Sequence, residues 1–299
     1  MTILLDARPL ADPLSGGVAR VAEGLIPALM RHLPEAKFVP VTTGMKKIGL
    51  SELDSLRKHI RLPNKLFSLL TFFGITSLES ISDEKADVLF LPNIGFVGRP
   101  NIPYALLVHD LSFLIEPKWF SRKSRWWHKA VRAKRLIREA AFLFAVSHRT
   151  KQDMVALLGI AADRITVIPI GLPNIPASCL QLPASISSRY LLAIGANNPR
   201  KNIGCVIEAV KELRKDPNYA DVSLVCTGGN CFSFRPPSSG FLFLSRPSSP
   251  AMASLMKNAV AFLYPSWYEG YGLPLHEAAR FGTPCVASTA GCLPETAPD

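Results

Sequence analysis

The sequence lacks the features that would mark a membrane-spanning or secreted protein. The stretch that comes closest to a spanning helix, LFSLLTFFGI at residues 66–75, falls well short of the roughly 18–20 apolar residues required. It reads as a core or interfacial helix instead. The opening residues MTILLDARPL include an acid at Asp6 and no long apolar region, so we expect no signal peptide.

The sequence also offers little that would bind a metal or form disulfides. Its six cysteines form no CxxC pair, and several lie in apolar, strand-like runs. This favours buried free thiols in a reducing cytoplasm over disulfides or zinc. Neither a GxGxxG motif nor a Walker loop is present, so the simplest nucleotide-binding fingerprints are excluded.

Acidic residues are outnumbered by basic ones, and most of the surplus lies in the first part of the chain. Residues 1–185 hold 24 Lys and Arg against 15 Asp and Glu, residues 186–299 hold 10 against 8, and the net charge is +11. A basic first half favours anionic partners, which include phosphate-bearing substrates, an anionic membrane surface and nucleic acid. With 299 residues, 48% hydrophobic and 19% charged, the chain has the composition of a folded protein of one large or two smaller domains.

Short apolar runs alternate with amphipathic helical stretches along the chain. Most runs are continuously apolar, as in strands of a parallel sheet covered on both faces. Helical patterns lie between them, for example at residues 18–33 and 202–215. This βαβα rhythm predicts an α/β protein with parallel sheets. The predicted strands are residues 2–6, 37–43, 87–92, 104–110, 141–147, 165–170, 190–196, 221–228, 240–245, 259–265 and 284–288.

The rhythm breaks at residues 171–186. This segment is rich in proline, carries little charge and separates two predicted strands. Such unpatterned stretches connect modules better than they build cores. We therefore predict two doubly wound domains, residues 1–170 and 187–299, joined by a linker at 171–186.

Two candidate sites lie in the first domain. Gly16 and Gly17 follow the first predicted strand and open a helix, where backbone N–H groups attract anions, and a plain tight turn is the competing interpretation. His109 and Asp110 end a buried strand, and ligands of open α/β sheets bind at such carboxyl ends. A lone histidine is more often structural than catalytic, so both roles stay open for His109.

The second domain holds two stronger candidates. Arg200 and Lys201 stand at the start of a helix, where cations oppose the helix dipole, and they would suit a diphosphate. A solvated helix start is the competing interpretation. Glu269 lies in a Gly–Pro turn, and Glu277 lies on the helix that begins near Leu273. Without a cluster of His or Asp, metal binding is disfavoured, and carboxylates suit vicinal hydroxyls, so we predict sugar or ribose contacts. Solvated surface acids are the alternative.

These motifs, taken in order, resemble the retaining glycosyltransferases of family 4. The matching segments run through essentially the whole chain, and the two glutamates with their GYGLP core form the most specific part. The segments are GGVAR from Gly16, VHDLSF from Val108, PRKN from Pro199, PSWYEGYGLPLHEAARFGTP from Pro265 and LPE from Leu293. The resemblance implies the GT-B fold, in which two Rossmann-like domains face each other across a cleft.

The resemblance also implies a reaction. A hexose, mannose as the first guess, passes from a GDP- or UDP-linked donor to a glycan or lipid-linked acceptor of cell-surface polysaccharide or lipopolysaccharide, with retention and without a metal or other cofactor. The first domain would serve the acceptor and the second the nucleotide sugar.

Residue roles are implied in the same way. Lys201, with Arg200, would neutralise the departing diphosphate, Glu269 would bind the transferred sugar, and Glu277 would hold the ribose. His109 would contact the donor sugar, and Gly16 and Gly17 would approach phosphate or acceptor. Backbone amides would add donors to sugar and phosphate along Gly270, Tyr271, Gly272 and Leu273.

The chain ends at Asp299, where members of the resembled family continue with further strand–helix units. From this we expect an incomplete second domain. An alternative function follows: a truncated, inactive relative that at most binds nucleotide.

Residues 122–140, RKSRWWHKAVRAKRLIREA, form the densest basic run. Trp126, Ala130, Ala133, Ile137 and Ala141 recur at helical spacing and predict one helix with an apolar stripe. Core packing beneath a solvated basic face and docking on anionic lipid remain equally open. Nucleic acid is the least favoured partner, because no known binding module is present. We predict a cytoplasmic protein, with peripheral contact at the inner face of the membrane as the alternative.

Overall fold

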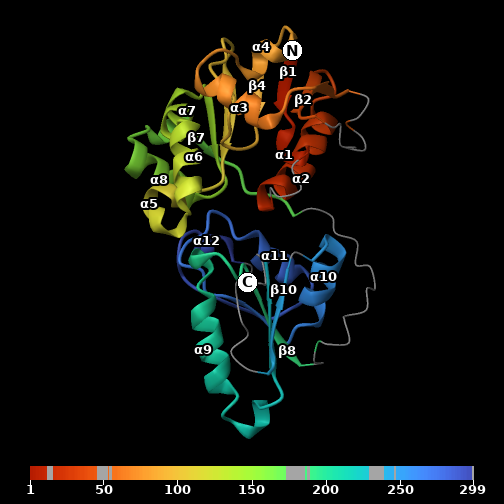
Figure 1. Cartoon of the computed structure of the whole chain (residues 1–299), viewed down its shortest axis with the longest axis vertical. Coiled ribbons are helices and arrows are strands. Elements are labelled where there is room, and N and C mark those ends of the chain that lie inside the picture. The colour runs from red at the N-terminus through yellow and green to blue at the C-terminus, as the bar shows by residue number, and fades with distance from the viewer. Residues whose placement is uncertain are drawn as a thin grey trace. The chain divides into compact units, whose positions relative to one another are not determined.

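The computed structural model describes residues 1–11, 16–45, 53, 56–172, 186, 189–228, 239–245 and 247–297. It divides the chain into two compact units, Met1–Pro173 and Asn174–Asp299 (Figure 1). The predicted linker at 171–186 lies almost entirely outside the described residues.

Unit 1 contains a seven-stranded, fully parallel sheet in the order β3-β2-β1-β4-β5-β6-β7. All of its apolar runs predicted as strands form strands. The short edge strand β3 was missed, because its sequence KHI has no apolar run. The strands are β1 (Thr2–Asp6), β2 (Lys37–Thr43), β3 (Lys58–Ile60), β4 (Val88–Leu91), β5 (Tyr104–Val108), β6 (Phe142–Ala145) and β7 (Ile165–Val167).

Helices cover both faces of this sheet. Along β1, Leu4 packs into one apolar cluster and Ile3 and Leu5 into another, which explains why the strand is apolar at three successive positions. The helices are α1 (Arg8–Ala11), α2 (Gly17–His32), α3 (Asn64–Phe72), α4 (Leu78–Ser82), α5 (Ser112–Ile115), η2 (Pro117–Trp119), α6 (Arg122–Ala130), α7 (Ala133–Glu139), α8 (His148–Leu158) and η3 (Ala162–Arg164).

Unit 2 contains a five-stranded parallel sheet in the order β10-β9-β8-β11-β12. Its strands are β8 (Tyr190–Ile194), β9 (Ser223–Thr227), β10 (Phe241–Leu244), β11 (Ala261–Tyr264) and β12 (Cys285–Ala287). Its helices are η4 (Pro199–Lys201), α9 (Ile203–Leu213), η5 (Pro217–Tyr219), α10 (Ser249–Asn258), α11 (Leu273–Arg280) and α12 (Leu293–Thr296). Both sheets are parallel, as predicted.

The strand order locates the ligand-binding edge of each sheet. In both units the chain winds outward in one direction from the first strand and then returns to continue on its other side, so β1 lies beside β4 and β8 beside β11. Loops that leave the carboxyl ends of two such strands diverge to opposite faces and leave a crevice where ligands bind in open α/β sheets. The segments that follow β8 and β11 therefore define the candidate site of unit 2.

The single helix predicted over residues 122–140 is wrong. The segment forms α6 and α7, and Arg132 between them has a left-handed backbone with φ of 53°. Ala130, Ala133 and Ile137 are buried as the stripe predicted, but Trp126 and Ala141 are exposed. Trp126 lies on α6, before the break at Arg132, and Ala141 lies beyond the end of α7, so neither continues the stripe of α7. Of the helices in the described residues, none is long and apolar enough to cross a membrane.

An ion pair between Arg8 and Asp6 lies at the carboxyl end of β1. The Arg8 guanidinium donates to both oxygens of Asp6, at 2.7 and 2.6 Å, and to the carbonyl of Phe96 at 2.6 Å. It also lies over the Phe67 ring, 4.8 Å from the centroid. Asp6 is almost fully buried, so its charge depends on Arg8 for compensation.

We expect Arg8→Met to lower the free energy of unfolding by about 3 kcal/mol, because it leaves the Asp6 carboxylate buried without its cation. Combining it with Asp6→Asn removes both charges and should cost less than the sum of the two single changes. Urea denaturation followed by circular dichroism measures each value. The exposed pair Arg189–Asp221 is the control, where Arg189→Met should cost below about 1 kcal/mol. Equal costs at Arg8 and Arg189 would contradict the prediction.

Candidate active site

Two cations follow the carboxyl end of β8. The strand ends at Ile194, and the turn after it leads into η4, where Asn198 accepts a hydrogen bond from the Arg200 backbone N–H at 3.1 Å. Gly195 has φ of +94°, and a Cβ atom there would lie 2.5 Å from Cγ of Lys201. Only glycine therefore lets the Lys201 side chain cross the end of the strand.

Glu269 arrives from β11, the neighbouring strand. It stands in the loop between β11 and α11 and is buried. The backbone of this loop packs closely against Gly291, where an added Cβ would lie 2.6 Å from both the N and O atoms of Glu269. The Cys292 backbone N–H also donates to the Glu269 carbonyl at 3.1 Å. These contacts hold the backbone of Glu269 and thereby position its carboxylate.

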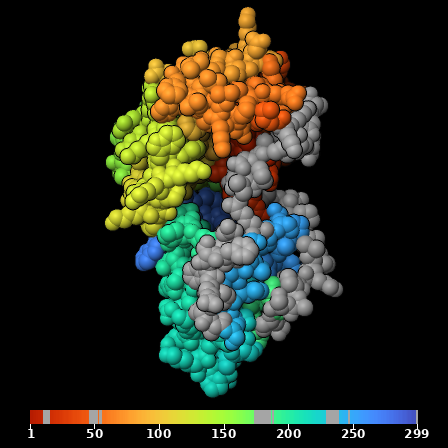
Figure 2. All heavy atoms as spheres, viewed as in Figure 1, coloured from red at the N-terminus to blue at the C-terminus, as the bar shows by residue number. Residues whose placement is uncertain are grey.

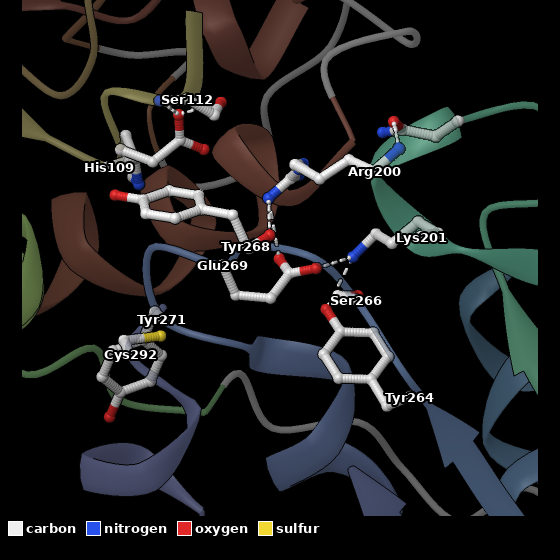
Figure 3. A network of polar contacts seen from close by, with 12 residues as sticks. His109, Ser112, Arg200, Lys201, Tyr264, Ser266, Tyr268, Glu269, Tyr271 and Cys292 are labelled. Carbon is white, nitrogen blue, oxygen red and sulfur yellow. Dashed lines mark hydrogen bonds and ion pairs between the residues drawn. The ribbon is translucent and has the colours of Figure 1, made fainter. Parts of the chain in front are cut away.

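The two segments meet in one polar network (Figure 3). The Lys201 ammonium donates to Oε1 of Glu269 at 2.6 Å and to the Tyr264 hydroxyl at 2.6 Å. The Arg200 guanidinium donates to the Tyr268 carbonyl at 2.7 Å and lies 3.1 Å from Oε2 of Glu269. The Lys201 nitrogen also lies over the Tyr264 ring, 4.4 Å from its centroid.

The network keeps Glu269 ionised and Tyr264 neutral. Burial alone would raise the pKa of the Glu269 carboxyl, but the charges of Lys201 and Arg200 and hydrogen bonds from Lys201 and Ser266 outweigh it and lower that pKa. Burial, with the nearby Glu269 charge, raises the pKa of Tyr264 well above its ordinary value, so the phenol stays neutral. With two cations and one anion, the network retains one net positive charge, which favours an anionic ligand.

Glu277 and the glycine-rich turn complete the candidate residues of unit 2. Glu277 lies on α11 and is only 2% exposed, so it is not the solvated surface acid of the alternative interpretation. The turn Gly270–Gly272 leads into α11 at Leu273, and the backbone N–H groups of this helix start are suited to an anion. The ring of Tyr271 stacks on that of His276 at 5.0 Å between centroids. The Tyr271 carbonyl accepts a hydrogen bond from the Thr296 hydroxyl.

The remaining candidates belong to unit 1. His109 follows β5, and its Nε2 atom lies 2.8 Å from the Pro92 carbonyl oxygen, which can only accept, so Nε2 carries the proton. Burial lowers the pKa of His109, so the ring is neutral at pH 7 and Nδ1 is an acceptor. Asp110, the next residue, accepts hydrogen bonds from the backbone N–H and the hydroxyl of Ser112 at the start of α5. Gly16 is the N-cap of α2, and an added Cβ at Gly16 or Gly17 would meet no atom within 4 Å.

Sequence reasoning treated the cations and Glu269 as separate candidates, and the structure joins them. Sequence reasoning also missed Tyr264 and Ser266, although a tyrosine at the carboxyl end of a buried strand is a usable signal. The described residues contain no group of three or more His, Cys, Asp or Glu placed to hold a metal ion.

Comparison with known families identifies both halves of the chain. Residues 15–173 match the family described as Glycosyltransferase Family 4, and residues 188–299 match the family described as Glycosyl transferases group 1. Together these segments include every candidate site residue discussed above.

Similar curated proteins are mannosyltransferases. The chain is 27% identical over 209 residues to O-antigen chain mannosyltransferase B of Escherichia coli, which covers 64% of this chain and 54% of that protein. It is 28% identical over 194 residues to MMP alpha-(1->4)-mannosyltransferase of Mycolicibacterium hassiacum, with 58% and 45% covered. The chain thus spans about half the length of the curated relatives it matches.

Solved structures show the same fold. WaaG, a glycosyltransferase involved in lipopolysaccharide biosynthesis, superposes with a TM-score of 0.65 at 16% identity, covering 98% of this chain and 82% of the other. Sucrose-phosphate synthase of Thermosynechococcus elongatus gives a TM-score of 0.65 at 18% identity, with the same coverage. The chain has the GT-B fold expected from its sequence.

The lowered pKa of Glu269 predicts acid-sensitive stability. Since the unfolded state takes up the proton more readily, the stabilisation from ionised Glu269 is complete above its ordinary pKa of 4.5 and is lost as the pH falls through the lower folded-state value. We expect Glu269→Gln to cost about 2 kcal/mol or more at pH 7, and the difference from the native protein to shrink below pH 4.5.

Urea unfolding at a series of pH values measures this difference. The matched control places Glu269→Gln in a Lys201→Met background, where the pH dependence should be smaller because one of the two cations is gone. A difference that stays constant down to about pH 3 would contradict the assignment.

Proposed function

The chain belongs to glycosyltransferase family 4, and from that premise we propose that it transfers a hexose from a nucleoside-diphosphate sugar to a glycan or lipid-linked acceptor. We propose mannose as the sugar, since the curated relatives named above are mannosyltransferases. The proposed acceptors are those of cell-surface polysaccharide or lipopolysaccharide synthesis, with residues 122–140 as a point of contact with an anionic membrane. We further propose that residues 1–170 serve the acceptor and residues 187–299 the donor.

The observation that carries the proposal is the Arg200–Lys201–Glu269 network at the β8–β11 edge. A diphosphate leaving group carries negative charge, which grows as the bond to the sugar breaks. A preorganised, mostly buried cation pair stabilises that growing charge more than it stabilises the bound donor, and this difference accelerates the reaction. The side-chain exposures of 15% and 11% for Arg200 and Lys201 keep water from weakening the interaction.

The proposed reaction retains the anomeric configuration. The bond between the anomeric carbon and the diphosphate oxygen breaks, and its electron pair stays on the diphosphate. The acceptor oxygen forms its bond to the same face of the sugar, and the acceptor proton passes to the departing phosphate oxygen. No protein nucleophile is required, and Lys201 and Arg200 supply the charge stabilisation, so we propose a metal-independent reaction.

The two glutamates have different proposed roles. Glu277, an almost fully buried acid on α11, is proposed to accept hydrogen bonds from the ribose hydroxyls. Glu269 positions the two cations, as its ion pairs indicate, and is proposed to contact the transferred sugar at the same edge. The amides of the turn at Gly270, Tyr271, Gly272 and Leu273 are proposed to donate to sugar and phosphate. The proposed phosphate or acceptor contact of Gly16 and Gly17 stays a prediction.

We expect Lys201→Ala to reduce turnover of GDP-mannose or a UDP-sugar by about 10²–10³-fold, because the leaving diphosphate loses its point charge. Circular dichroism and thermal unfolding should show that the fold persists. Product formation with each donor gives the turnover, and Lys215→Ala, at an exposed lysine of the same unit, is the control. Unchanged turnover would refute the role of Lys201.

Calorimetry separates the ribose role from the phosphate role. We expect Glu277→Gln to weaken binding of GDP or UDP about tenfold, while binding of the 2′,3′-dideoxy analogue stays the same, since that ligand lacks the hydroxyls in question. Lys201→Ala should weaken both ligands alike. If the native protein binds neither GDP- nor UDP-sugars, the enzymatic proposal fails.

His109 is proposed to accept a hydrogen bond from a donor-sugar hydroxyl through Nδ1. We expect His109→Ala to lower kcat/KM by about 10–100-fold while nucleotide affinity measured by calorimetry changes little. Because the pKa of His109 is lowered from its ordinary value of 6.5, the native rate should persist below pH 6.5 and fall only at more acid pH. A rate that halves near pH 6.5 in step with ordinary histidine titration would contradict this assignment.

A further inference from the structure

Helix α3 of unit 1 exposes its apolar side chains. Leu66, Leu69 and Phe73 recur three to four positions apart, and they are 42%, 53% and 66% exposed. The opposite side of the helix packs inward through Phe67 and Thr71, which are buried. Several large apolar side chains gathered on an exposed surface are unusual for a folded unit, and such a patch marks an interaction surface.

The patch continues beyond α3. Ile75, just after the helix, is 69% exposed, and Trp126 of α6 is 62% exposed. The ring of Phe72 lies 5.2 Å from that of Phe73 and 6.3 Å from that of Trp126, so the two helices share one surface. We call the set the apolar ridge, and its members are Leu66, Leu69, Phe72, Phe73, Ile75 and Trp126. In Figure 2 the orange segment with α3 and the yellow segment with α6 adjoin on the face shown.

Cations line two cavities that adjoin the ridge. A cavity of about 310 Å³ joins its Phe72–Phe73 end to Arg99, Arg132 and Arg135. A larger cavity of about 980 Å³ lies beside Trp126 and shares Arg132 and Arg135 with the first. The only acid that lines either cavity among the described residues is Glu139, and it is paired with Arg135 at 2.6 Å. The further cations that line the larger cavity are Arg122, Arg125, Lys129, Lys134 and Arg138.

We propose that the apolar ridge and these cations form one docking surface for an anionic lipid bilayer. The phenylalanine, leucine and isoleucine side chains would enter the boundary between headgroups and acyl chains, with Trp126 at the interface. The cations would meet the negative headgroups, each contributing several-fold to binding near the surface. Apolar side chains and positive charge on one face match a bilayer, whereas a soluble polyanion would engage the charge alone.

This inference deepens the proposed function, because a lipid-linked acceptor would be delivered at the same surface, and on that point it rests on the proposed function. Vesicle binding itself requires neither donor nor transfer. The two proposals can therefore fail separately: a chain that docks on vesicles without transferring sugar, or one that transfers sugar without docking, identifies which of them is wrong.

The test is co-sedimentation of the full chain with phosphatidylcholine vesicles, with and without phosphatidylglycerol. We expect binding to the anionic vesicles that weakens as salt is raised, and little binding to pure phosphatidylcholine. Leu69→Ser with Phe73→Ser should weaken binding at least about tenfold, since two exposed apolar groups lose their insertion. Arg122→Ala with Arg125→Ala should also weaken it about tenfold or more.

Two matched controls separate the ridge from general effects. Val155→Ser with Leu157→Ser removes apolar groups that are 37% and 41% exposed on α8 of the same unit, and Arg31→Ala removes an exposed cation of α2. Both should bind vesicles as the native chain does. Brominated lipid should quench the fluorescence of Trp126, and Trp126→Phe should remove the contribution of this residue to the total quenching.

Three results would overturn the proposal. The first is equal binding to neutral and anionic vesicles, and the second is native binding by the Leu69–Phe73 variant with its fold intact by circular dichroism. The third is a change in oligomeric state, seen by sedimentation velocity, when the ridge is altered. That result would mean that a second copy of the chain covers this surface.

Discussion

The candidate site depends on the ion pair between Lys201 and Glu269. These residues lie 68 positions apart and meet because β8 and β11 are parallel neighbours in the sheet, so the loops that follow both strands begin at the same edge. A buried carboxylate is costly without a compensating cation, and here Lys201 and Arg200 both provide one. The surrounding backbone is shaped around this contact, with Gly195 making room for the lysine and Gly291 for the glutamate.

The same physical pattern recurs in unit 1 with a different outcome. Asp6 at the end of β1 is compensated by Arg8, whose guanidinium also reaches the Phe96 carbonyl and the Phe67 ring. One cation and one anion leave this ion pair neutral, whereas two cations and one anion leave the Arg200–Lys201–Glu269 network positive. This difference in charge supports the diphosphate role proposed for Arg200 and Lys201.

Much of the fold was predictable from local pattern. Continuous apolar runs predicted the parallel strands because strands covered on both faces have no polar side, as the two clusters around Leu4 and Leu5 show. The short strand β3 and the break at Arg132 were not predictable in this way. Strand β3 forms only because β2 offers an edge, and the helical pattern of residues 122–140 carries no glycine or proline to signal its interruption.

The sequence by itself determined which side chains were available: two adjacent cations after one strand, two glutamates around a glycine-rich turn after another, and apolar residues at helical spacing near residue 70. Only the tertiary structure decided how they were used. Sheet order brought Lys201 to Glu269, and spacing along the chain holds no information about which strands become neighbours. The structure also shows that Phe67 is buried whereas Phe73 is exposed. Helical periodicity could not predict this difference, because it is the same for a face that packs in a core and for one that meets solvent.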